Sequence, residues 1–188
     1  MSLFEYVAVI VSMILALAVG QLLLGAAGLA KNRKRVSGYL AHTLWMVLLF
    51  LFAVNLWWSQ WDLRDIDWTF PSFFYVICSP TLLFFAVAIL LPDDPGGRDV
   101  DLDAHFFAVR PIFLSIMLTF LITAWFDGPI LQGQPVLGRV GQLSLVYVVA
   151  ILWGLATESR RVHLVLSAAL VSVFSLFVVV RFLPGAGG

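Results

Sequence analysis

The chain has 188 residues, of which 62% are hydrophobic and 12% are charged, and its formal net charge is zero. Soluble domains carry about 25% charged residues, so the composition excludes an ordinary soluble domain. The lack of net positive charge gives nucleic-acid binding no electrostatic support. The single cysteine, Cys78, excludes an internal disulfide and any mechanism that needs paired thiols.

Six long apolar runs take up most of the chain. A helix needs about 20 apolar residues to cross the hydrocarbon core of a bilayer, and each run is long enough. The runs lack the alternating pattern of a barrel strand. The sequence therefore predicts an all-α integral membrane protein, one domain over residues 1–188, with six transmembrane helices in three antiparallel hairpins. The predicted spans are residues 3–30, 38–58, 70–91, 106–126, 136–157 and 163–183.

The first two spans enclose a basic loop. Residues 3–30 lack a basic n-region and exceed the length of a signal-peptide core, so we interpret them as a span. Gln21 lies near the middle of this run. His42 lies about one turn inside the predicted hydrocarbon edge of the second span. Both are polar groups at membrane depth, where a functional role is a reasonable first hypothesis.

A tryptophan-dense segment follows the second span. Aromatic side chains gather at the membrane interface because the ring is apolar and its N–H needs a partner, so an interfacial belt is the simpler interpretation. A docking site for a lipid, a quinone or a hydrophobic partner is the alternative. The predicted rim consists of Trp57, Trp58, Trp61, Trp68 and, from the matching end of the fourth span, Trp125.

Prolines interrupt the third and fourth spans. Pro80 falls inside the third span and should kink it, because proline frees a carbonyl one turn back. Pro111 directly follows Arg110 and leaves two alternatives. Either the fourth span is kinked near its start, or residues 103–109 form a short interfacial segment and the span begins at Pro111.

An acidic segment, residues 99–105, precedes the fourth span. Its alternating aspartates resemble the start of a calcium loop, but the required glycine and the bidentate glutamate are missing. We interpret it as a solvated loop whose carboxylates pair with the basic residues 31–35. Asp101 and His105 are four residues apart and could pair if that stretch is helical.

The basic residues predict the orientation, because cytoplasmic loops carry an excess of Lys and Arg. Eight lie on one side of the predicted membrane and three on the other. Both termini are therefore predicted to be non-cytoplasmic. The larger group is Lys31, Arg33, Lys34, Arg35, Arg98, Arg110, Arg160 and Arg161, and the smaller is Arg64, Arg139 and Arg181.

Each returning span carries a histidine near its cytoplasmic start, which is consistent with a threefold hairpin repeat, although chance is an equal explanation. Histidines suit a proton relay, and three could complete a metal or haem site. Rings that bond headgroups, water or loop carboxylates are the simpler explanation. The predicted cytoplasmic-side cluster consists of Gln21, His42, His105, Arg110, Glu158 and His163, with His42, His105 and His163 as the only metal-ligand set.

A second group of polar residues is predicted on the outer side. Charged residues at helix ends are expected to satisfy one another, for example as a Glu5–Arg139 or Glu5–Arg181 pair. The predicted outer cluster consists of Glu5, Asn55, Arg139, Gln142 and Arg181.

These features leave three functions open. The first is an oligomeric channel or small transporter for ions or protons, suggested by the six-span architecture. The second is a non-catalytic accessory, scaffold or sensor subunit of a larger complex. The third is a haem- or metal-binding redox protein. No hydrolytic constellation is visible, which favours a protein that is not an enzyme. We expect no cofactor, and as partners membrane lipids and a second copy or a partner membrane protein, in the bacterial inner (plasma) membrane.

Overall fold

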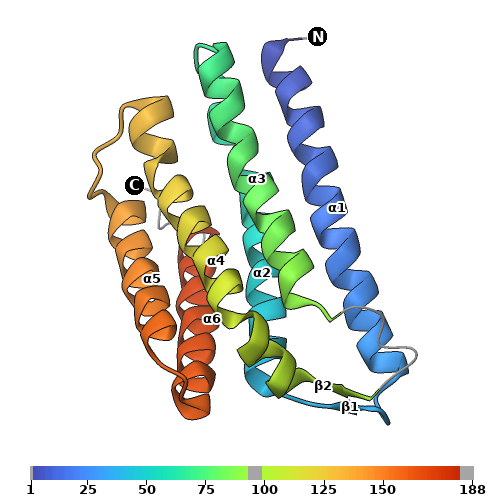
Figure 1. Ribbon diagram of the computed structural model, residues 1–188. Helices are drawn as coiled ribbons and strands as arrows, with labels where there is room; N and C mark the ends of the chain where they lie inside the picture. Colours follow the sequence, from blue (N-terminus) through green and yellow to red (C-terminus); the bar gives the residue numbers. More distant parts are fainter. Residues whose placement is uncertain (1, 93–98, 183–188) are drawn as a thin grey trace.

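The structure, a computed structural model, describes residues 2–92 and 99–182, without the side chains of Arg139, Arg181 and Phe182. Within these residues the fold is all-α apart from two strands of two residues each (Figure 1). The helices are α1 (Leu3–Lys31), α2 (Leu40–Ser59), α3 (Phe70–Leu90), α4 (Leu102–Gln132), α5 (Arg139–Ala156) and α6 (Arg160–Phe182), and a 3-10 turn, η1 (Gln60–Leu63), follows α2.

Local capping explains where several helices begin and end. Ser2 and Glu5 form a reciprocal capping box at the start of α1. Thr69 caps α3 in the same way. Asp101 caps α4 by accepting the backbone N–H groups of the next turn. Gly133 ends α4 in the left-handed conformation, with φ of 63°, which glycine adopts without steric cost.

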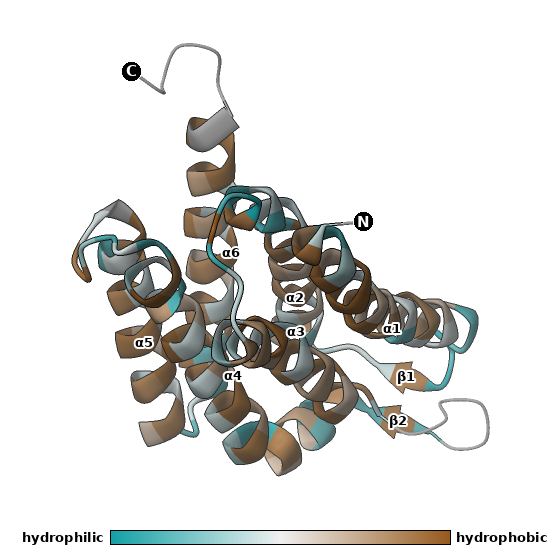
Figure 2. Cartoon of the chain, turned by 90° about the horizontal axis from the view of Figure 1, so that it is seen from above, coloured by the Kyte–Doolittle hydropathy of each residue, from teal (hydrophilic) through white to brown (hydrophobic). Residues whose placement is uncertain are grey.

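The helices alternate in direction, so the bundle has two distinct ends (Figure 1). The strand end holds β1 (Val36–Ser37), β2 (Val100–Asp101) and the α5–α6 connection. The tryptophan end holds the start of α1, the α2–α3 connection and the α4–α5 connection. α1 and α5 lie on opposite sides of the bundle (Figure 2).

Helix neighbours differ in part from the predicted hairpins. The most extensive packing joins α3 with α4, α1 with α3, α4 with α5, and α2 with α6. The hairpin partners α1 and α2, and α5 and α6, share much less contact. A short connection fixes adjacency only at one end of a helix pair, whereas side-chain packing along the whole length decides the neighbours.

The parallel pair β1–β2 was not predicted. Val36 pairs with Val100 and Ser37 with Asp101, and the Val100 N–H donates to the Arg35 carbonyl at 2.8 Å. One strand lies between α1 and α2 and the other between α3 and α4, so both of these connections contain a strand. In the described residues, α5 and α6 are joined without a strand, so the third hairpin does not share this feature.

The apolar surfaces of the helices fit a membrane protein. Five helices are long and apolar enough to span a membrane, and the sixth, α5, has a shorter apolar part, Val140–Ala156. The predicted span 136–157 was too long, because residues 136–138 belong to the connection before α5. Hydrophobic residues run along all the helices and hydrophilic ones gather at their ends and in the loops (Figure 2). The chain therefore has five to six helices that could cross a membrane.

Both prolines predicted to disturb a span lie inside a continuous helix. α3 continues through Pro80, and α4 continues through Pro111 and Pro129. Figure 1 shows the first turns of α4 at an angle to the rest of the helix, so the alternative of a kinked span fits better than a separate interfacial segment.

Candidate functional site

Two histidines meet one backbone carbonyl where α3 ends. His42, near the start of α2, and His105, near the start of α4, place Nε2 at 2.9 and 3.0 Å from the Leu90 oxygen. A carbonyl only accepts, so both Nε2 atoms carry a proton and donate it. The ring centroids lie 6.2 Å apart. His42 is fully buried, so its ring contacts protein rather than lipid headgroups.

A second carbonyl, that of Thr157 after α5, also receives two donors. His163 Nε2 lies 3.0 Å and Arg110 Nη1 2.7 Å from this oxygen. Arg110 Nη2 pairs with Glu158 at 3.2 Å, and its guanidinium lies 5.7 Å from the Phe107 ring centroid. The Arg110 side chain is buried and the Glu158 side chain is exposed, so the ion pair reaches from the bundle to its surface.

These contacts give the histidines a structural role. The last carbonyls of a helix lack intrahelical partners and carry partial negative charge, so donors and cations are stabilising there. Each histidine hydrogen-bonds the start of one helix to the end of another. The starts of α2 and α4 bind the end of α3, and the start of α6 binds the end of α5. The predicted cytoplasmic-side cluster is thus split into two groups, one around the Leu90 carbonyl and one around the Thr157 carbonyl. Gln21 lies on α1, where its Oε1 is buried without a hydrogen-bond partner.

The metal hypothesis gains no support from this geometry. Residues 2–92 and 99–182 contain no group of three or more His, Cys, Asp or Glu side chains that could hold a metal ion. The Nε2 atoms of all three histidines are engaged by carbonyls, and Nδ1 of His42 and of His163 is buried without a hydrogen-bond partner.

The acidic loop is anchored differently from the prediction. Asp101 Oδ1 accepts the N–H groups of Asp103 and Ala104 at 2.9 and 3.2 Å, while His105 turns to Leu90, so the predicted Asp101–His105 pair does not form. The hydrogen bond from Ala104 holds the pKa of Asp101 below its usual value. Asp103 forms an ion pair with Arg160. The predicted pairing of these carboxylates with residues 31–35 is therefore wrong for Asp101 and Asp103, whose partners lie elsewhere.

The residues of the predicted outer cluster do not lie together in the part of the chain that the structure describes. Glu5 accepts the Ser2 N–H at 2.9 Å, as part of the α1 cap. The Gln142 amide donates to the Leu137 carbonyl at 3.3 Å. Asn55 lines a cavity described below. The predicted pairs of Glu5 with Arg139 or Arg181 involve side chains outside the described part of the chain.

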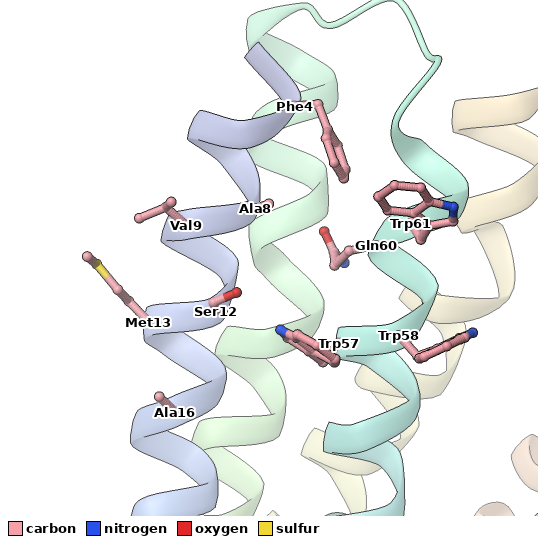
Figure 3. A pocket seen from close by; sticks show the side chains of 10 residues that line it. All are labelled: Phe4, Ala8, Val9, Ser12, Met13, Ala16, Trp57, Trp58, Gln60 and Trp61. Carbon is pink, nitrogen blue, oxygen red and sulfur yellow. The ribbon is translucent and has the colours of Figure 1, made fainter. Parts of the chain in front are cut away.

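An apolar groove lies between α1 and α2 at the tryptophan end. Its volume is about 690 Å³. The Phe4 and Trp61 rings meet edge to face, with centroids 6.4 Å apart, and Trp57 points toward α1 (Figure 3). Three residues of the predicted rim thus belong to this groove, which is lined by Phe4, Ala8, Val9, Ser12, Met13, Ala16, Trp57, Trp58, Gln60 and Trp61.

A central cavity of about 640 Å³ opens at the same end, among residues of α2, α3, α4, α5 and α6. Its charged lining residues with described side chains are Asp62 and Asp127, both acidic. Asp127, on the last turns of α4, is half-buried. Trp125 also lines the cavity, and its indole N–H donates to the Val136 carbonyl at 2.7 Å.

The floor of the central cavity is aromatic. The Phe52 ring contacts those of Phe120, Tyr147 and Phe174, with centroids 5.5, 5.9 and 4.8 Å away. One turn closer to the strand end, a packed layer closes the bundle. That layer contains the fully buried side chains of Trp45, Leu49, Leu83, Phe113, Leu114 and Met117.

One wall of the cavity contains a buried polar group without a hydrogen-bond partner. Ser79 is only 2% exposed, lines the cavity, and its hydroxyl has no hydrogen-bond partner. The next residue, Pro80, has no N–H to donate to the carbonyl of Val76, another lining residue. Such groups are tolerated at membrane depth only where they line a cavity or find another partner.

The sequence did not single out Asp127 or Ser79. The fourth span was predicted to stop at residue 126, so Asp127 was assigned to a loop, although α4 continues to Gln132. The proline after Ser79 was the one available signal, because it marks a freed carbonyl.

No known protein family, curated protein or solved structure matches the chain.

Proposed function

We propose that the chain is a small transporter for cations or protons and that the central cavity is its solute-binding site. The observation that carries the proposal is the half-buried Asp127 carboxylate in the cavity wall. An ionisable group within a membrane helix is costly to maintain, and a functional role is its default explanation. The cavity volume also falls within the range of small-molecule sites, about 300–1,000 Å³.

The closed floor favours a transporter over a channel. A continuous pore would need polar groups or water through the layer that contains Trp45, Phe113 and Met117, all fully buried. A cavity that opens at one end fits one state of a transporter that exposes its site to each side in turn.

The orientation and assembly are part of the same proposal. The strand end carries most of the basic residues, so we place it in the cytoplasm, with both termini on the other side of a bacterial inner membrane. The exposed side chains of Met13, Leu17 and Leu24 leave an apolar face of α1 for lipid, a second copy or a partner membrane protein.

Flux into proteoliposomes tests the proposal. Purified protein should carry protons or monovalent cations down an imposed gradient, at a rate above that of empty vesicles. Asp127→Asn should lower the rate at least tenfold, because it removes the charge and little volume. Glu158→Gln, which neutralises an exposed carboxylate at the opposite end, should retain the rate. Wild-type vesicles that behave as empty ones under every gradient would contradict the proposal.

An accessory subunit of a larger membrane complex is the second candidate. The α1–α2 groove favours it, because a wide apolar groove with exposed Trp57 and Trp61 is suited to an apolar helix from a partner. The same flux measurement separates the two functions, since an accessory subunit carries no flux by itself.

A further inference from the structure

We propose that the central cavity binds an amphipathic organic cation, whose charged centre faces acceptor oxygens and whose apolar arms lie among aromatic rings. This inference rests on the proposed transport function, because it names the solute class of the same cavity. Three independent features of the wall support it: its aromatic rings, its unsatisfied oxygens and the sign of its charges.

The aromatic floor provides the apolar and cation-attracting surface. Four rings meet there, with Phe52 packed against Phe120, Tyr147 and Phe174. Ring faces attract cations through their quadrupole, and the attraction strengthens where water is excluded. The Tyr147 hydroxyl is already engaged, because it donates to the Leu170 carbonyl at 2.7 Å. Its ring therefore contributes a surface rather than a free donor.

Ser79 and Val76 provide oxygen acceptors on the α3 wall. The Ser79 oxygen has no partner and almost no accessible surface, so its side chain has to rotate to present the oxygen to the cavity, and the Val76 carbonyl lacks the helical N–H that Pro80 cannot supply. Unpaired groups at this depth cost free energy, and a bound cation would compensate that cost. Ser79 lies nine residues into α3, roughly 13 Å from its start at 1.5 Å per residue, so the acceptors lie well below the mouth.

The charges of the wall select the sign of the ligand. Among the lining side chains that the structure describes, Asp62 and Asp127 are the charged ones. A carboxylate attracts a cation and repels an anion of the same shape, most strongly where the surroundings are apolar. The cavity is also too large for a bare metal ion, and its rings do not coordinate one. An organic cation uses the whole volume.

Equilibrium binding of tetraphenylphosphonium to detergent-solubilised protein tests the inference. Tetraphenylborate is the matched control, because it has the same shape and opposite charge. The cation should bind at least tenfold more tightly than the anion. Asp127→Asn and Phe174→Leu should each weaken cation binding at least fivefold, the first by removing charge and the second by removing a ring while keeping an apolar side chain. Glu158→Gln, at the other end, should bind normally.

Equal affinity for the two ions, or variants of Asp127 and Phe174 that bind the cation as wild type does, would overturn the inference. Circular dichroism and size-exclusion profiles identify misfolded variants, and Ser79→Ala, the smallest change in the wall, should still weaken binding if either larger change prevents folding. Flux of protons or monovalent cations without tetraphenylphosphonium binding would reject this inference alone. Binding without any flux would reject the transporter and leave the cation site standing.

Discussion

At the scale of single residues, the polar groups of this helical bundle lie in two different settings. The three histidines donate hydrogen bonds to backbone carbonyls at helix ends and so connect neighbouring helices. Asp127 and Ser79 instead line a cavity. The sequence located the histidines at the starts of returning helices. It could not identify the partner of His42, because the Leu90 carbonyl lies 48 residues away and only the tertiary fold brings it close. The Thr157 carbonyl is six residues from His163, but the contact depends on the conformation of the α5–α6 connection.

The shared Leu90 carbonyl predicts energetic coupling between two histidines. His42→Ala and His105→Ala should each destabilise the protein by about 1–3 kcal/mol. The double variant should cost more than the sum, because only it leaves the buried carbonyl without a donor. Reversible unfolding in detergent measures all three. Additive effects would show that the two hydrogen bonds are independent, and a fully folded single variant without flux would contradict a purely structural role.

At the scale of helices and strands, the length and composition of the apolar runs predicted the helices that are long enough to span a membrane. Five of the helices are long and apolar enough to span a membrane, and the predicted bounds of several are close. The extension of α4 to Gln132 was missed, because Asp127 and Pro129 are ordinarily signals of a loop. The strands were missed because two residues carry no alternating pattern. The neighbours of α1 and α2 depend on side-chain packing, which no single run encodes.

The junction of α4 and α5 predicts a contrast between two glycines. A Cβ at Gly141 would collide with the Val136 carbonyl and lie 2.8 Å from Trp125 Nε1, whereas one at Gly20 would meet open space. Gly141→Ala should therefore destabilise the protein by about 1–3 kcal/mol. Gly20→Ala should be neutral or stabilising by up to about 1 kcal/mol, because alanine favours the helix. Thermal unfolding in detergent measures both, and equal midpoints would contradict the packing of this junction.

At the scale of the whole molecule, the bundle is closed at the strand end and hollow at the tryptophan end. The sequence predicted two polar zones, one near each end, but of the predicted outer residues with described side chains only Asn55 lines the hollow zone. In the strand-end zone, histidine and arginine side chains donate hydrogen bonds to backbone carbonyls. The hollow zone is built from residues of five helices, so it exists only in the assembled fold. This is why the sequence could suggest a transporter only by its architecture.

Cysteine accessibility in membranes tests most directly whether cations reach this cavity from water. Ser79→Cys, in a Cys78→Ala background that removes the native thiol, should react with a cationic trimethylammonium methanethiosulfonate at least tenfold faster than with an anionic sulfonate analogue. Leu83→Cys, one turn deeper in the packed layer, should react with neither. A Ser79→Cys thiol that is as inert as the one at position 83, or that reacts equally fast with both reagents, would contradict a cation-accepting cavity.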